Sequence, residues 1–486
     1  MIDGAISPAP MKAAPEGLDF PGRTKLATTL LIVYAALVVW GVVHHAMWRD
    51  EIQAWLIARD SADLPALLNN LRYEGHPALW YLVIWPLTRL GSDPALMQIP
   101  NVAFSIAAVA LVLRWAPFNR WELALFPFGY FVFFDYAVKS RSYALGSLLA
   151  MVACTLWPRR YSQPVLLAGV LALLANVHLV FAFLAVAFAA AVLVDRLRTI
   201  GWSRPSGIEL LAAMVLAVGW GCAIGAAWPA PDAISGRSIS ADPLMLRIGQ
   251  FATLAALIGP YRWVPAVLLG AAATAVAFAA IWREPAAVVL LAITLALSLL
   301  LFLLFHGGNF WHRGPIFLAF VGAIWIARLS PRAQPVSGGA PGRGILGFVL
   351  AMQAVSGLVA WHGDLMRPLS AGPAVARHII AQGWRDDPLV GSPDFAVATI
   401  VGHLGIADAY YGNVGRRGSF ALWDRARATP RDAATMLQDA DHLPRPTTLV
   451  TATPIDSLLA ARYGYREVAR FDAAEPTERF ILYRRE

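Results

Sequence analysis

The sequence has little charge and little cysteine, and both shortages narrow the class of protein. Charged residues occupy 14% of the 486 positions, whereas a typical soluble domain has about 25%. An ordinary soluble globular chain is therefore excluded. The chain has two cysteines, Cys154 and Cys222, and both fall inside apolar runs. That placement argues against a disulfide framework or a cysteine metal site.

The sequence instead contains long apolar runs, and hydrophobic residues make up 58% of the chain. A helix of about 20 apolar residues crosses a bilayer. The run 164–194 is too long for one crossing, and Asn176-Val177-His178 interrupts it, which predicts a short hairpin. About eleven transmembrane helices and an all-α polytopic membrane fold are therefore expected. The runs are 26–45, 95–113, 121–138, 142–157, 164–194, 209–228, 263–281, 286–305, 315–328 and 344–361.

The net charge of +8 comes almost entirely from arginines in short loops between apolar runs. This pattern suits the positive-inside rule and lipid headgroups better than nucleic acid. All the basic loops fall on one side of the membrane if two apolar segments do not cross it and instead lie flat or re-entrant. These segments are Pro77–Leu90 and Leu246–Ile258. Counting Pro77–Leu90 as a crossing would invert part of the partition. With the basic loops cytosolic, residues 1–25 form a disordered cytosolic tail, 26–361 the membrane domain, and 46–94 its first outer loop.

After Trp361 the composition becomes that of a soluble domain, and residues 362–486 are expected to form a small α/β domain on the outer face. Strand-like segments alternate with helical patterns, and the domain has no glycine-rich phosphate loop or catalytic signature. Packing or acceptor docking is the simpler interpretation of its role. The strands are expected at 389–392, 447–451 and 479–483, and the helices at 394–404, 431–440 and 455–463.

The opening of the first outer loop combines acidic residues with a membrane boundary. Asp50 and Glu51 follow the first apolar run directly, where charge is costly unless it is used. A carboxylate there can accept a proton from an acceptor hydroxyl while a sugar is attacked at its anomeric carbon. The acids can equally stabilise the start of a helix. The two interpretations are compatible.

Further polar residues are expected on the same face. Glu74-Gly75-His76-Pro77 predicts a turn opening a helix, and His76 could donate to a phosphate or orient Asp50. A single arginine at a membrane boundary is usually a lipid anchor, but several cations converging on two acids fit phosphate recognition. No DxD or HExxH motif is present, so a metal site is weakly supported. The outer-face cations are Arg141, His178, Arg237, Arg262, His312 and Arg313.

These motifs resemble those of the GT-C superfamily of membrane glycosyltransferases over about residues 26–330. The early Asp-Glu pair resembles that superfamily's first outer loop. Glu74-Gly75-His76-Pro77-Ala78-Leu79 is similar to the His-Pro-Pro-Leu segment of the protein mannosyltransferase and aminoarabinose transferase branches. Lys139-Ser140-Arg141-Ser142-Tyr143 looks like their Arg-x-Tyr segment, and His312-Arg313-Gly314-Pro315 is loosely similar to a later Arg-Tyr-x-x-Pro element. Within the superfamily, the chain looks most like bacterial lipopolysaccharide galacturonosyltransferases.

The resemblance implies an inverting glycosyltransferase of the bacterial inner membrane, acting on the periplasmic face. Its donor would be a polyprenyl-phosphate-linked sugar and its acceptor a hydroxyl on a lipid, glycan or protein. Asp50 would be the general base, Glu51 a supporting group, and Arg141 and Arg313 would hold the donor phosphate. Neither metal nor cofactor is implied. Ala78 stands where the family's segment has its second proline. Donor or substrate binding is predicted for His76, Arg141, Tyr143, His178, Arg237, Arg262, His312 and Arg313.

Two other functions are compatible with a polytopic chain. A transporter or flippase of lipid-linked intermediates would need polar groups near the bilayer midplane and broken helices in repeated units. Here the ionisable residues gather at the outer boundary, and the apolar runs are clean. A non-catalytic assembly subunit with an outer docking domain is the third possibility.

Overall fold

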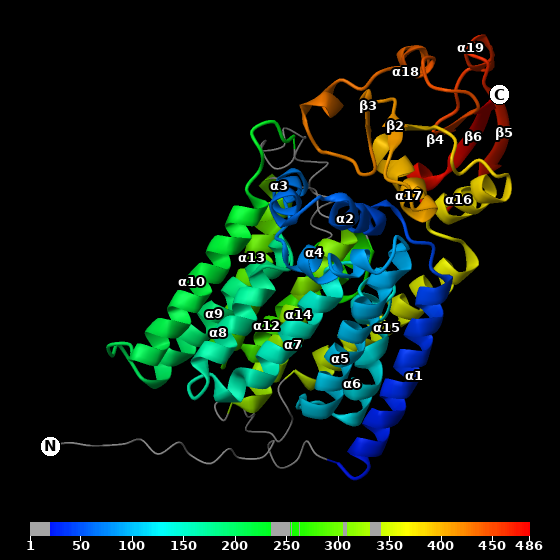
Figure 1. Ribbon diagram of the computed structural model, residues 1–486. Helices are drawn as coiled ribbons and strands as arrows, with labels where there is room; N and C mark the ends of the chain where they lie inside the picture. The colour runs from blue at the N-terminus through cyan, green and yellow to red at the C-terminus, as the bar shows by residue number, and fades with distance from the viewer. Residues whose placement is uncertain (1–19, 235–252, 254, 262, 305–308, 331–341) are drawn as a thin grey trace.

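The structure is a computed structural model that describes residues 20–234, 253, 255–261, 263–304, 309–330 and 342–486. A helical bundle carries a smaller α/β domain at one end (Figure 1). Eight helices among the described residues are long and apolar enough to cross a membrane, so the chain is a multi-pass membrane protein. They are α1 (Arg23–His44), α5 (Gln98–Trp115, with the turn before it), α9 (Leu179–Thr199), α10 (Gly207–Ala227), α12 (Val264–Ile281), α13 (Pro285–Leu304), α14 (Gly314–Leu329, with the turn before it) and α15 (Arg343–Met366).

The other predicted crossings correspond to shorter or broken helices. Helices α7 (Tyr143–Leu156) and α8 (Pro164–Ala175) have 14 and 12 residues. At a rise of about 1.5 Å per residue, both helices are shorter than the hydrocarbon layer, which is about 30 Å thick. The predicted run 121–138 is not one helix. It divides into α6 (Arg120–Leu125), the 3-10 turn η3 (Phe126–Phe128) and the π-helical turn η4 (Tyr130–Asp135). Pro127 lies at this break and lacks a backbone N–H.

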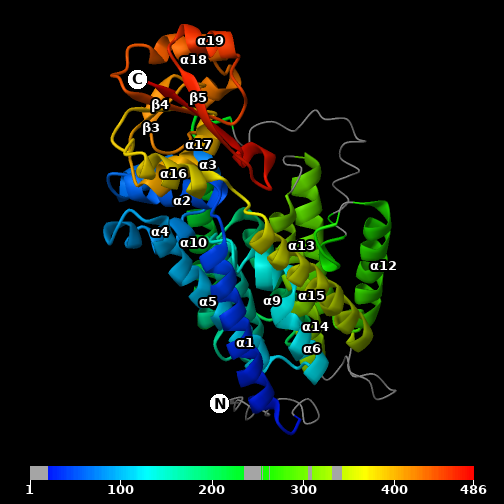
Figure 2. The ribbon, with the colours of Figure 1, turned by 90° about the vertical axis from the view of Figure 1, so that its right-hand side faces the viewer.

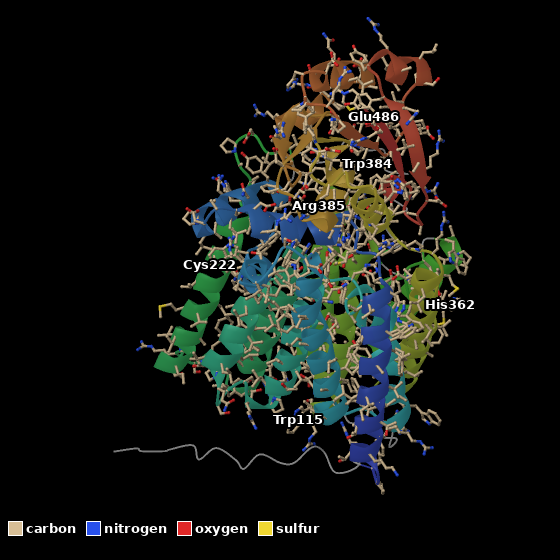
Figure 3. The ribbon with its side chains drawn as sticks, turned by 45° about the vertical axis from the view of Figure 1, so that its right-hand side comes forward. Trp115, Cys222, His362, Trp384, Arg385 and Glu486 are labelled. Carbon is tan, nitrogen blue, oxygen red and sulfur yellow. The ribbon has the colours of Figure 1, made fainter. Side chains whose placement is uncertain are left out.

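Two ion pairs lie at the end of the bundle away from the α/β domain. Arg328 pairs with Glu122, and Arg160 pairs with Asp195, where helices meet at the end away from the α/β domain. Figure 3 shows Trp115, which ends α5, at that far end, and Trp384, Arg385 and Glu486 in the α/β domain at the other. The predicted basic loops, in their described parts, thus share one end. The first loop lies at the opposite end.

The first loop is built of short helices lying across the end of the bundle. They are α2 (Arg49–Asp60), α3 (Leu64–Glu74), α4 (Leu79–Ile84), η1 (Leu87–Arg89) and η2 (Pro94–Met97). The six residues of α4 are far too few to span a bilayer, so the expected non-crossing Pro77–Leu90 agrees with the structure. Most of the other predicted flat segment, Leu246–Ile258, lies outside the described residues.

The C-terminal sheet has six strands in the order β3-β2-β1-β4-β6-β5. Strand β1 runs parallel to both β2 and β4, and the remaining pairs are antiparallel. The predicted strands and helices of this domain appear as β1, β4, β6, α17, α18 and α19, while α16, β2, β3 and β5 were not predicted. The elements are α16 (Gly372–Ala381), β1 (Leu389–Ser392), α17 (Asp394–Leu404), β2 (Ala409–Tyr411), β3 (Arg416–Gly418), η9 (Arg425–Ala428), α18 (Ala433–Ala440), β4 (Thr447–Thr451), α19 (Ser457–Arg462), β5 (Arg466–Phe471), η10 (Pro476–Glu478) and β6 (Phe480–Arg485).

The first loop and the α/β domain share one hydrophobic core. Ile52 and Trp55 of α2 are fully buried in the same cluster as Ile400 and Val401 of α17. Figures 1 and 2 both show α2 lying between the bundle and helices α16 and α17. Since strand residues alternate between faces, Val450 joins this core while its neighbour Leu449 packs against α18 and α19 on the other face of the sheet. The first loop is therefore held between two hydrophobic layers.

Candidate active site

The candidate site is centred on an ion pair between the first loop and the turn that precedes α7. Asp50 lies in the first turn of α2, and its Oδ2 is 3.2 Å from Nη1 of Arg141. The Arg141 guanidinium also lies over the rings of Tyr143 and Trp311, at 5.0 and 5.1 Å from their centroids. The Asp50 side chain is 27% exposed. It is thus held near a cation and can be reached from outside the bundle.

Glu51 is fully buried, and its two oxygens face other parts of the protein. Oε1 accepts a hydrogen bond from the backbone N–H of Ser140 at 2.6 Å. Oε2 accepts from the N–H of Trp48 at 3.2 Å and contacts Nε2 of His45 at 2.8 Å. Because Ser140 precedes Arg141, Glu51 links the start of α2 to the segment that carries the guanidinium. This geometry suits the supporting role expected for Glu51.

His45 extends this link to the last membrane helix. Its Nδ1 lies 2.8 Å from Oδ2 of Asp364 near the end of α15, and all three side chains of the cluster are at most 5% exposed. Burial alone would lower the pKa of His45, but Glu51 and Asp364 outweigh it and raise this pKa to about 10. A cationic imidazole between two carboxylates therefore joins α1, α2 and α15.

A second buried ion pair shares the Trp311 ring with Arg141. Asp135, at the end of the π-helical turn η4, accepts a hydrogen bond from Nζ of Lys139 at 2.9 Å. Lys139 also lies over the Trp311 ring, so the indole contacts two cations. Asn101 donates to the carbonyl oxygens of Ala137 and Tyr136 at 2.9 and 3.2 Å, which holds the turn in place. π-helical turns are frequent at functional sites.

Three imidazole rings stand side by side next to this pair. The rings of His76 and His178 are 4.4 Å apart, and those of His178 and His312 are 5.4 Å apart. Nε2 of His178 lies 3.3 Å from the Tyr143 hydroxyl. Gly75, in the left-handed conformation at φ 69°, ends α3 and turns the chain into His76. The structure thus assembles predicted residues from three segments.

Arg313 lies at the start of the most buried membrane helix. It belongs to the 3-10 turn η7 (Phe310–Arg313) that leads into α14, is 3% exposed and lies 4.9 Å from the Phe310 ring centroid. The other two predicted cations, Arg237 and Arg262, lie outside the described residues.

The α/β domain also reaches the site, through residues that were not among the predicted ones. Gln53 of α2 donates to Glu74 at 2.8 Å and exchanges two hydrogen bonds with the backbone of Ala421. The pKa of Glu74 is raised to about 7, chiefly by burial and in part by Asp50, against the opposing effects of the Gln53 hydrogen bond, Arg427 and Arg141. Glu74 is therefore within electrostatic range of cations from both the bundle and the α/β domain.

Some of the site residues that were not predicted stand next to predicted ones in the sequence. Glu74 stands in the same turn as His76, and Trp311 stands beside His312. Arg427 and Asp364 carry no local signal, because only the tertiary fold brings them here. Within the described ranges, no group of three or more histidine, cysteine or acidic side chains is arranged to hold a metal ion.

Comparisons with known proteins find a likeness of structure. No family model matches the chain, and neither does any curated sequence. The structure is similar to that of ArnT from Cupriavidus metallidurans bound to undecaprenyl phosphate, with a TM-score of 0.54, 13% identity and coverage of 95% of this chain and 98% of that one. The apo structure of the same protein is similar with a TM-score of 0.56 and 14% identity, and the match covers 94% of this chain and 98% of that one. The chain therefore has a GT-C fold with a C-terminal α/β domain.

Proposed function

We propose that this chain is an inverting glycosyltransferase that moves a sugar from a polyprenyl-phosphate donor to a hydroxyl acceptor on the periplasmic face of the bacterial inner membrane. The observation that carries the proposal is the Asp50–Arg141 pair at the end of the bundle opposite the basic loops. The shared fold supports the donor class, since one of the ArnT structures is bound to undecaprenyl phosphate. A hydroxyl on a lipid, glycan or protein is the proposed acceptor.

In the proposed reaction Asp50 is the general base. Its carboxylate takes the proton of the acceptor hydroxyl as the acceptor oxygen attacks the anomeric carbon. The bond between that carbon and the phosphate oxygen breaks, and the polyprenyl phosphate leaves with the electron pair. Attack from the face opposite the leaving group inverts the anomeric centre. The products are the glycoside and the lipid phosphate.

The proposed phosphate site consists of Arg141 and Arg313 with the three imidazoles. A guanidinium offers a planar set of N–H donors that matches phosphate oxygens. Fixed donors aimed at the leaving phosphate stabilise the charge that develops there. The bilayer holds the prenyl tail, so the protein has only to position the head group near Asp50. In this scheme arginine and histidine supply the positive charge, so no metal is invoked.

Lipid and glycan mass spectrometry of a strain lacking the gene tests this function. We expect one sugar-modified envelope species to disappear and its polyprenyl-phosphate-linked donor to accumulate. Wild type and Asp60→Asn, a matched change at the other end of α2, should restore the species, and Asp50→Asn should not. Full restoration by Asp50→Asn would remove this residue from the mechanism, and an unchanged glycan profile in the deletion strain would contradict the proposed function.

A further inference from the structure

We infer that the α/β domain supplies an acceptor site, in which Arg427 and Trp423 bind a sugar ring that carries a carboxylate or phosphate group beside Glu74. This inference rests on the proposed function and deepens it, because it names the chemical class of the acceptor. It also gives the C-terminal domain a direct part in recognition.

The segment that carries these residues is fastened to the first loop. The Gln53 amide donates to the carbonyl oxygen of Ala421 at 2.6 Å and accepts from its N–H at 3.0 Å. The same amide donates to Glu74 at 2.8 Å. One side chain of α2 therefore holds both the α/β segment and a carboxylate of the site. The next residues along this segment lead to Trp423 and Arg427.

Arg427 is a buried cation with unused donor capacity. Its Nη2 lies 3.0 Å from Oδ1 of Asp394, and its side chain is 7% exposed. Within the described part of the chain, its buried Nη1 has no hydrogen-bond partner. Burial lowers the pKa of Arg427 and Asp394 offsets this only in part. A ligand anion at Nη1 would satisfy that donor and compensate the buried charge.

An aromatic surface adjoins the guanidinium. Arg427 lies 3.9 Å from the Trp423 ring centroid, and Trp423 stacks on Phe395 with centroids 6.3 Å apart and planes 23° apart. Both rings are partly exposed. Arg49, next to the proposed base, lies over the same Phe395 ring at 5.3 Å. A buried guanidinium that lies over one face of Trp423, beside partly exposed rings, fits a pyranose that carries an anionic substituent.

Glu74 places this surface next to the proposed chemistry. Its carboxyl group interacts electrostatically with Asp50, Arg427 and Arg141 together. With a pKa raised to about 7, chiefly by burial, Glu74 is partly protonated near neutral pH. In that form it can donate a hydrogen bond to an acceptor oxygen. An acceptor whose anion lies at Arg427 and whose hydroxyl contacts Glu74 would extend from the α/β domain toward Asp50.

Ligand-observed NMR on the purified full-length protein in nanodiscs tests the site. The probes are methyl glucuronide for a carboxylate, N-acetylglucosamine 1-phosphate for a phosphate, and methyl glucoside as the neutral match. We expect at least one charged probe to bind wild type, with affinity falling by about tenfold or more in Arg427→Gln. Arg425→Gln, an exposed neighbour in the same turn, should bind like wild type. The charged probe that binds more tightly identifies the anionic group.

Three results would overturn the inference: no binding of either charged probe to wild type, equal binding of the neutral probe, or unchanged binding in Arg427→Gln. Removing Arg427 leaves Asp394 without its cation, so Trp423→Leu is the second variant if the first fails to fold. It should weaken both charged probes while keeping the ion pair. Undecaprenyl phosphate binding, measured alongside, should be unchanged in both variants. If wild type binds undecaprenyl phosphate but neither charged probe, the acceptor site alone is contradicted, whereas failure of wild type to bind undecaprenyl phosphate contradicts the proposed function.

Discussion

Nη1 of Arg141 lies 3.2 Å from Oδ2 of Asp50. The residue proposed to bind the donor phosphate and the proposed general base therefore form one ion pair. A donor phosphate that binds Arg141 competes with Asp50 for the guanidinium. Binding of the donor would thereby free Oδ2 of the carboxylate for the acceptor hydroxyl, while Oδ1 keeps its contact with Nε of Arg49 at 3.6 Å. This coupling orders the proposed reaction, with donor binding first and deprotonation of the acceptor second.

Replacing Arg141 should weaken donor binding in a graded way. Arg141→Ala removes both the charge and the planar donor set, and we expect the affinity for undecaprenyl phosphate to fall by about tenfold to a hundredfold. Arg141→Lys keeps the charge without the bidentate geometry, so its loss should be smaller. Arg114→Ala, exposed at the far end of the bundle, is the control. Equal affinities in all four proteins, measured in nanodiscs, would exclude Arg141 from the phosphate site.

Asp50→Asn should separate binding from chemistry. Transfer should fall by about 10²–10⁴-fold because the amide cannot accept the acceptor's proton. Undecaprenyl phosphate should bind at least as tightly as to wild type, since a competing carboxylate has been removed. Envelope mass spectrometry measures the first effect and lipid titration the second. A variant that loses both equally would assign Asp50 to donor binding instead of catalysis.

The buried cluster around His45 should matter for stability. His45→Phe leaves Glu51 and Asp364 buried without their shared cation, which we expect to lower the free energy of unfolding by about 3–5 kcal/mol. His44→Phe is a matched control, because the neighbouring His44 is exposed. Chemical unfolding in detergent measures both. Similar effects of the two changes would show that the cluster contributes little.

Glu478 should make stability depend on pH. Burial raises its pKa to about 7, although it accepts hydrogen bonds from Ser370 and from the N–H of Arg49. The folded state therefore holds this proton more tightly than the unfolded state, whose carboxyl has a pKa near 4.5. The contribution of Glu478 to stability falls as pH rises from about 4.5 to about 7, and stays low above that range.

Glu478→Gln should flatten this part of the pH profile, because the amide does not titrate. Unfolding followed between pH 4.5 and 8 gives the slope directly. Glu475→Gln, which is partly exposed in the same turn, should keep the slope of wild type. An unchanged slope in Glu478→Gln would show that another group is responsible.

Contact between α2 and α17 depends on the absence of a side chain at Gly402. A Cβ at this position would lie 2.3 Å from Cγ2 of Ile52, so Gly402→Ala should push the two helices apart and cost about 1–3 kcal/mol. Transfer should also fall, because Asp50 is carried on α2. Gly418→Ala, with open space around it, is the control. Adding Ile52→Ala should recover part of the activity, and failure to do so would argue against steric coupling.

The membrane architecture could be predicted from local features of the sequence. Apolar runs of bilayer length define helices because no backbone polar group can be left unpaired in lipid. Arginine placement separates the two ends of the bundle. The run 121–138 was wrongly expected as one helix, because hydropathy does not register the break at Pro127. Strands β2, β3 and β5 were missed because β2 and β3 have only three residues each and three of the six residues of β5 are charged.

The sequence by itself determined a polytopic membrane fold with a C-terminal α/β domain, and placed Asp50, His76 and Arg141 in segments that could face one another. These follow from periodicity and from the cost of charge at a membrane boundary, which act over short stretches of chain. Only the tertiary structure decided which charges meet. The pairing of Asp50 with Arg141, the contact of His45 with Asp364, and the approach of Arg427 to Glu74 join residues far apart in sequence. Packing of α2 between the bundle and α17 sets these contacts, and no local pattern records such packing.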